Sequence, residues 1–183
     1  MSARKLNHQI LVFVYGTLKQ GEPNAAIMTD LTFGKQKFLG KGKTVKKYPL
    51  IVASRFNIPF CLDQPGIGHN YSGHHLLKLI TVKHLQHVTG EVYQVDEKKL
   101  IVLDEFEAHP SFYERKLREV KMDCSGAVLK AWIYLLTKWK SSLLQECSTY
   151  LETYNSDGPH FRPYIKSYFG VGLCGALDKK LNE

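Results

Sequence analysis

The spacing of apolar and polar positions along the chain predicts many strands and few helices. Residues 10–15 form an unbroken apolar run, which is typical of a buried strand. Looser alternation between apolar and polar positions predicts further strands at 35–47 (one or two strands), 48–53, 58–62 and 88–95, and a hairpin of 112–120 with 127–135. Strands therefore dominate the expected structure.

Helical signals are fewer. Asn24 could cap a short helix over 25–31, and Asp96 offers an N-cap for a helix over 98–107. Residues 139–151 form a third helical candidate. The combination predicts an α+β fold in which a curled or barrel-like sheet carries a few short helices.

The 183 residues suffice for one domain with a real core, and we expect a single domain over 1–183. Five of the eight histidines fall within 69–87. His84 and His87 have a spacing that could hold a metal on a helix, but no acid or cysteine accompanies them. We therefore expect an inserted surface segment at 69–87 without a metal, and an atypical, apolar C-terminal tail at 161–183.

Composition favours a cytoplasmic protein. No apolar run reaches the roughly 18–20 residues of a membrane helix, and no signal-peptide core precedes the first predicted strand. The four widely spaced cysteines are then expected to be free thiols; they are Cys61, Cys124, Cys147 and Cys174.

The net charge of +8 is unevenly distributed. Residues 35–55 hold seven positive charges and no acid, whereas 91–107 hold six acids and two lysines. A basic stretch can attract nucleic acid or an anionic surface. Here the lysines alternate with other residues, as on the solvated face of a strand, so no specific nucleic-acid partner is expected.

One candidate site is the turn after the first predicted strand, formed by Tyr15, Gly16, Thr17 and Leu18. A sharp turn containing glycine can aim successive backbone N–H groups at a carboxylate or a developing oxyanion. An ordinary strand-ending turn remains the alternative, since single glycines are common in turns.

A second candidate is Glu107, which falls between Leu100 and Leu103 on the wheel of the predicted helix. Desolvation and the negative helix C-terminus would both raise its pKa and make it a better base near neutral pH. Periodicity leaves open the alternative that Glu107 reaches solvent or pairs with Arg115.

The sequence contains no convincing motif for another type of catalytic site. The chain contains no G-x-S-x-G elbow, phosphate-binding loop or G-x-G-x-x-G fingerprint. Cys61 has no recognisable context for a catalytic thiol. His160, in the fragment Asp-Gly-Pro-His that ends on it, could belong to a charge relay but fits a turn at least as well.

An ordered set of motifs spread over residues 10–160 resembles the γ-glutamylamine branch of the γ-glutamylcyclotransferase-like (AIG2-like) family. The matching segments are 12–19, 21–24, 48–53, 57–60, 90–93, 103–107, 112–115 and 154–160. The resemblance implies a small mixed β-barrel with a cavity, a substrate-binding role for Tyr15 to Leu18, and catalysis by Glu107 without metal or organic cofactor.

The activity implied by this resemblance is the cyclisation of γ-glutamylamines such as ε-(γ-glutamyl)-lysine to 5-oxoproline and a free amine. Two alternatives remain: a sister activity on γ-glutamyl amino acids or related compounds, and a binding module without turnover. We expect a monomer that acts on a small molecule and does not engage a membrane.

Overall fold

The computed structural model describes residues 9–65 and 85–166. Its centre is a closed barrel with the strand order β1-β5-β2-β6-β7. The barrel strands are β1 (Ile10–Val14), β2 (Gln36–Thr44), β5 (Thr89–Val95), β6 (Tyr113–Met122) and β7 (Val128–Leu136). Neighbouring strands run antiparallel except at the closure, where β1 and β7 are parallel and Val12 pairs with Trp132. The predicted α+β barrel with few short helices is confirmed.

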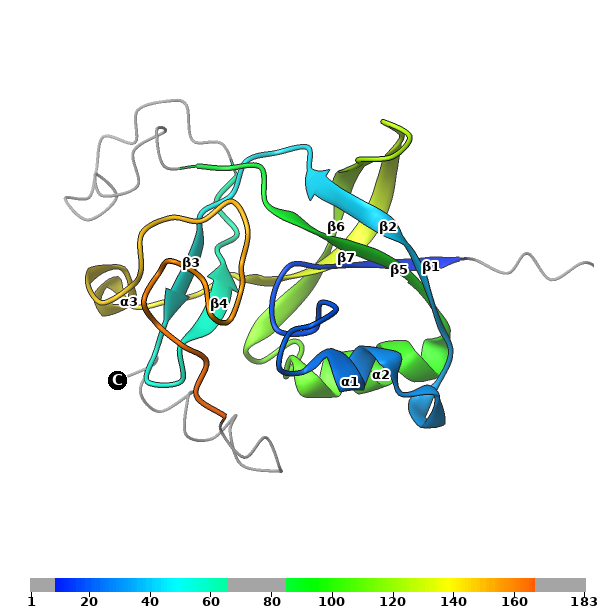
Figure 1. Cartoon of the computed structure of the whole chain (residues 1–183), viewed down its shortest axis with the longest axis horizontal. Helices are drawn as coiled ribbons and strands as arrows, with labels where there is room; N and C mark the ends of the chain where they lie inside the picture. Colours follow the sequence, from blue (N-terminus) through cyan, green and yellow to red (C-terminus); the bar gives the residue numbers. More distant parts are fainter. Residues whose placement is uncertain (1–8, 66–84, 167–183) are drawn as a thin grey trace, which may run out of the picture.

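A two-stranded sheet stands beside the barrel (Figure 1). It pairs β3 (Leu50–Ala53) with β4 (Ile58–Cys61), and all eight of these residues are buried. A bridge from Leu62 to Leu136 connects the end of β4 to β7. This small sheet covers part of the barrel and brings Pro59 toward the loop that follows β1.

The continuous apolar run of β1 is explained by burial on both faces. Val12 and Val14 belong to one core cluster, whereas Phe13 and Tyr15 belong to another. Because successive side chains of a strand point to opposite faces, a strand between two cores has no polar face. β7 shows the same alternation between the two clusters.

Two helices pack together on one side of the barrel (Figure 1). They are α1 (Ala25–Thr29), followed by a 3₁₀ turn over Leu31–Phe33, and α2 (Glu97–Phe106). The buried Lys99 of α2 donates to the carbonyls of Ile27 and Asp30, at 2.9 and 2.6 Å. A lysine ammonium thus satisfies carbonyls at the C-terminal end of α1 and fixes the two helices to each other.

Local capping signals were partly correct. The Asp96 side chain accepts a hydrogen bond from the Lys99 N–H at 2.8 Å, so the predicted N-cap of α2 is confirmed. Asn24 caps nothing with its side chain; it donates instead to the Tyr164 hydroxyl, at 3.3 Å. The helix predicted over 139–151 is wrong over most of its length, because only α3 (Ser141–Gln145) is helical.

The basic stretch lies largely on β2 and its flanks, where Lys37, Lys41 and Lys43 are exposed. The predicted solvated strand face is therefore confirmed. No helix among the described residues is long and apolar enough to cross a membrane. Cys61, Cys124 and Cys147 are free thiols, while Cys174 lies outside the described residues.

Most of the predicted insertion lies outside the described residues, including four of its five histidines. The fifth, His87, has its Nδ1 2.9 Å from the Thr44 carbonyl. Within 9–65 and 85–166, no group of three histidine, cysteine or acidic side chains is placed to hold a metal.

Candidate active site

Glu107 occupies the junction between α2 and β6. It is the C-cap of α2, with φ −82° and ψ 1°, and its N–H donates to the Leu103 carbonyl at 2.9 Å. The next residue, Ala108, has the left-handed φ of 50°, which turns the chain away from the helix axis. The Tyr113 N–H then donates to the Glu107 carbonyl at 3.4 Å. Helix end and strand start together fix the backbone of this glutamate.

The carboxyl group of Glu107 lies deep among protein atoms although the residue keeps some solvent exposure. Burial raises the pKa of Glu107 from its ordinary value of 4.5 to about 8. Within the described part of the chain, no hydrogen bond or ion pair engages this carboxyl group. It is therefore available to an incoming ligand and basic enough to accept a proton near neutral pH.

Three buried tyrosines from three strands or strand ends surround this carboxyl group: Tyr15, Tyr113 and Tyr134. Burial is the main cause that raises the pKa of each hydroxyl, and the negative charge of the glutamate adds to it. The hydroxyls are thus neutral donors at any physiological pH.

None of the three tyrosine hydroxyls donates to the glutamate. Tyr15 donates to the Tyr134 carbonyl at 2.8 Å, and Tyr113 donates to the Pro59 carbonyl at 3.0 Å. Tyr134 donates to Oδ1 of Asp104 at 2.7 Å. With these protons committed elsewhere, the glutamate has no neutral donor that would lower its pKa.

The candidate loop follows β1 directly. Tyr15, Thr17 and Leu18 are buried, and the turn is closed by hydrogen bonds from the Lys19 N–H to the Gly16 carbonyl and from the Asn24 N–H to the Thr17 carbonyl, at 3.2 and 2.9 Å. In contrast, the backbone N–H groups of residues 16–18 donate to no described residue. Unpaired successive N–H groups form the kind of nest that binds an anion.

Gly16 is required by space rather than by a left-handed backbone. A Cβ atom at this position would lie 2.7 Å from Cγ of Pro59 on β4. Pro59 also accepts the hydroxyl of Tyr113, which stands beside Glu107. The loop and the glutamate, 91 residues apart in sequence, therefore reach the same region through Pro59 and the tyrosine rings.

Two buried carboxylates hold the loop, and the sequence did not identify them as part of the site. Glu91 on β5 accepts from the Gln20 N–H at 2.9 Å and from the Tyr93 hydroxyl at 2.8 Å. Glu22 accepts from the Ser156 N–H at 2.9 Å. The sequence did contain a signal for Glu91, since it is a glutamate inside the apolar pattern of β5. It precedes Tyr93 by two residues and therefore lies on the same face of the strand.

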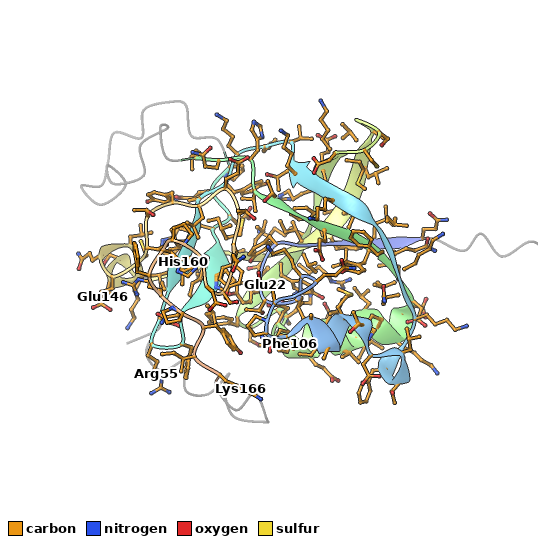
Figure 2. All side chains as sticks on the ribbon, in the orientation of Figure 1. Glu22, Arg55, Phe106, Glu146, His160 and Lys166 are labelled. Atoms are coloured by element: carbon orange, nitrogen blue, oxygen red, sulfur yellow. The ribbon has the colours of Figure 1, made fainter. Side chains whose placement is uncertain are left out.

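The segment 154–160 packs against this loop. The Lys19 ammonium donates to the Tyr154 carbonyl. The Ser156 N–H of the same segment donates to Glu22, at 2.9 Å; Figure 2 labels Glu22 and, from this segment, His160. The loop is thus held from both sides, by β5 and by a segment more than 130 residues away.

The weaker candidates do not acquire catalytic surroundings. The ring of His160 stacks on Tyr154, accepts at Nδ1 from the Arg162 N–H at 3.1 Å, and lies 2.8 Å at Nε2 from the Asn155 carbonyl. Both ring nitrogens are used by backbone, which supports the turn interpretation. Burial raises the pKa of the Cys61 thiol, so its nucleophilic thiolate is disfavoured.

Comparison with known proteins gives a consistent result. A family model described as "Gamma-glutamyl cyclotransferase, AIG2-like" matches residues 12–155. The mouse protein named Gamma-glutamylaminecyclotransferase is 37% identical over 155 residues, covering 81% of this chain and 91% of the relative. A Drosophila melanogaster protein with the provisional name gamma-glutamylcyclotransferase is 39% identical over 142 residues, covering 78% of this chain and 79% of the relative.

The fold is also similar to a solved structure. The crystal structure of an AIG2-like protein from mouse superimposes with a TM-score of 0.73 at 36% identity. The match covers 88% of this chain and 98% of the mouse chain. Fold and sequence therefore agree over the barrel and the segments that carry the candidate site.

Proposed function

The chain belongs to the γ-glutamyl cyclotransferase, AIG2-like family, and on that premise we propose that it cyclises γ-glutamylamines to 5-oxoproline and a free amine. A representative substrate is ε-(γ-glutamyl)-lysine, from which the leaving amine is lysine. The observation that carries the proposal is the unpaired, desolvated carboxyl group of Glu107 beside a loop with free N–H groups.

Substrate binding is assigned to the loop after β1. The N–H groups of Gly16, Thr17 and Leu18 suit the α-carboxylate of the γ-glutamyl group or the oxyanion that develops on its γ-carbonyl. Tyr15 carries this loop and forms part of the wall around Glu107. The α-ammonium of the substrate would face the glutamate, and its charge favours the ionised carboxylate that the reaction needs.

The chemical step needs one base and no second reactant. Glu107 takes a proton from the α-amino group, and the freed nitrogen attacks the γ-carbonyl carbon of the same molecule. A new C–N bond closes the five-membered ring, and the ring nitrogen releases its excess proton to solvent. The bond to the departing amine breaks, and the protonated Glu107 gives its proton to that amine. Holding the two ends of one substrate in a reactive pose supplies much of the rate.

The proposal is tested by incubating the protein with ε-(γ-glutamyl)-lysine, γ-glutamyl-alanine and glutathione, and measuring 5-oxoproline. Product from the lysine compound supports the proposal. The Drosophila relative's name favours a second candidate, cyclisation of γ-glutamyl amino acids, for which γ-glutamyl-alanine would be the better substrate. Absence of product from all three substrates would exclude both enzymatic functions and favour a binding module.

The role of Glu107 predicts the behaviour of Glu107→Gln. This variant keeps the shape of the side chain and removes the base, so kcat/KM should fall by about 10²–10⁴-fold. In the unaltered protein kcat/KM should rise with pH as the carboxyl group of pKa about 8 loses its proton. The matched control is Glu105→Gln, an exposed glutamate of the same helix, which should retain activity. Unchanged turnover in Glu107→Gln would remove Glu107 from the mechanism.

A further inference from the structure

An ion pair lies beside Glu107 without including it. Asp104, one turn earlier on α2, uses a single carboxylate oxygen for two partners. Its Oδ1 accepts the Tyr134 hydroxyl at 2.7 Å and lies 3.1 Å from Nε of Arg115. The side chains of Asp104 and Arg115 are only 22% and 17% exposed, so solvent screens the pair weakly.

Arg115 is held in place from several directions. Its guanidinium lies over the ring of Trp132, 4.7 Å from the ring centroid. Its backbone N–H donates to Nδ1 of His109 at 3.2 Å. In the β6–β7 register Arg115 lies directly opposite Tyr134, one of the three tyrosines around the glutamate. Tyr134 is therefore the group on which the charges of both Arg115 and Glu107 act.

The titratable groups near the three tyrosines, Glu107 aside, differ in sign and source. From β1, β4, β6 and β7 come hydroxyls and a thiol that burial keeps neutral, whereas α2 contributes a carboxylate and β6 the guanidinium. Glu107 acts on the hydroxyls of Tyr15, Tyr113 and Tyr134. Cys61 lies near Tyr15 and Tyr113, Asp104 and Arg115 lie near Tyr134, and the ring of His109 is in edge contact with Tyr134. Arg115 is thus the permanent cation of the set.

A cation that approaches a carboxylate within about 4–6 Å lowers its pKa by roughly 1–3 units. In the structure burial raises the pKa of Glu107 and Arg115 is paired with Asp104; an Arg115 released from that pair could approach Glu107 and act on it in this way. An ion pair between the two would also occupy the oxygens that must face the substrate amine. A free Arg115 would therefore produce a weaker and less accessible base.

We propose that Asp104 is a positioning residue that holds Arg115 and the Tyr134 hydroxyl away from Glu107, so that the glutamate stays unpaired. This inference rests on the proposed function for the meaning of Glu107 as a base. It assigns the aspartate of the Leu-Asp-Glu-Phe-Glu segment a role distinct from that of the final glutamate. The intervening Glu105 is exposed and takes no part.

The test compares Asp104→Ala, Asp104→Asn and the double variant Asp104→Ala/Arg115→Ala. Two quantities are measured: the pH profile of kcat/KM, and the titration of the Glu107 carboxyl by ¹³C NMR, assigned by its loss in Glu107→Gln. Both single variants release the charge of Arg115, so the apparent pKa should fall by about one unit or more. The double variant removes the released cation, and the pKa should return to within a few tenths of that of the unaltered protein.

Matched control variants distinguish a positioning role of Asp104 from a general loss of structure. Asp104→Asn keeps an acceptor for Tyr134 and nearly the same shape, which protects the fold. Tyr134→Phe removes the hydroxyl but leaves the ion pair intact, so it should shift the pKa by far less than Asp104→Asn. Glu105→Ala removes an exposed acid from the same helix and should leave the profile unchanged.

Equal profiles in the unaltered protein and Asp104→Asn would overturn the proposal. So would equal shifts in the single and double variants, because Arg115 would then not be the agent. If the protein formed no 5-oxoproline, the proposed function would fail, yet the NMR titration would still report whether Asp104 keeps Arg115 from Glu107.

Discussion

At the residue scale, the raised pKa of Glu107 links activity to stability. The unfolded chain ionises this carboxyl group near its ordinary pKa of 4.5, whereas the folded protein does so near a pKa of about 8. Between these values the folded state binds more protons, so the free energy of unfolding falls as pH rises. Under the proposed function, the pH range in which Glu107 is ionised and can act as a base is also the range in which it contributes least to stability.

This coupling predicts a second property of Glu107→Gln. The glutamine side chain cannot ionise, so the unfolding free energy of this variant lacks the decrease that ionisation of Glu107 causes at high pH. We expect its melting temperature to exceed that of the unaltered protein by a margin that widens between about pH 5 and about pH 9. Thermal denaturation across this range checks the prediction, with Glu105→Gln as the exposed control; a constant margin would mean that burial does not shift the pKa of Glu107.

Gly16 illustrates a different constraint on one residue. A methyl group at this position would meet Pro59 at 2.7 Å, so Gly16→Ala should cost about 1–3 kcal/mol of unfolding free energy and move the loop. KM should rise because the N–H groups of the loop lose their alignment. Chemical denaturation and steady-state kinetics measure both effects.

A second change tests whether Pro59 is the cause. Adding Pro59→Ala to Gly16→Ala removes the atom that the new methyl group meets. The double variant should lose less unfolding free energy than the sum of the losses in the two single variants. Strict additivity would show that the loop glycine is needed for some other reason.

At the scale of elements, strands β2 and β6 place like charges opposite each other. Lys43 on β2 pairs in register with Lys121 on β6, and both are exposed. Like charges directly across a ladder are destabilising. Glu119 and Lys130 on β6 and β7 form the opposite case, a register pair of unlike charges.

Lys121→Glu should therefore stabilise the barrel by about 0.5 kcal/mol at low salt. Lys130→Glu, the matched control, should destabilise it by a similar amount because two acids would then face each other. Denaturation curves at low and high salt measure both, and screening should shrink both effects. Stabilisation by both changes would instead indicate that only the excess positive charge matters.

Sequence signals identified the elements whose causes are local. The apolar run of β1 and the N-cap at Asp96 were readable because one segment contains the whole signal. The helix expected over 139–151 does not form over most of this range, because the backbone there hydrogen-bonds to β3. The Ser148 N–H donates to Val52, and the Leu151 N–H donates to Leu50, each at 2.8 Å. Tertiary contacts replaced the helix that periodicity favoured.

The same distinction applies to the site. Glu107 and the loop 15–18 were candidates from the ordered motifs and the apolar arc, and the structure brings them to one region through Pro59 and the tyrosines. Glu22 and Glu91 were missed because their partners, Ser156 and Gln20, lie 134 and 71 residues away. Sequence patterns thus indicate candidate residues with a local signal more easily than the distant residues that hold them in place.

At the scale of the whole molecule, the barrel joins distant parts of the chain. β1 pairs with β5 on one side and with β7 on the other, through Val12 and Trp132. Contacts of such long sequence separation form slowly, because large loops must close before any of them is made.

The closure between β1 and β7 has a consequence for how the protein is made. A growing chain leaves the ribosome from its N-terminus, so β1 and the loop 15–18 emerge long before their partners. Until β5 has emerged, the apolar strand has no strand to pair with. The β1 edge that pairs with β7 stays exposed until β7 has emerged, and the loop 15–18 is held from its second side only when Ser156 reaches Glu22. The first segment of the site to be synthesised is among the last to be held in place.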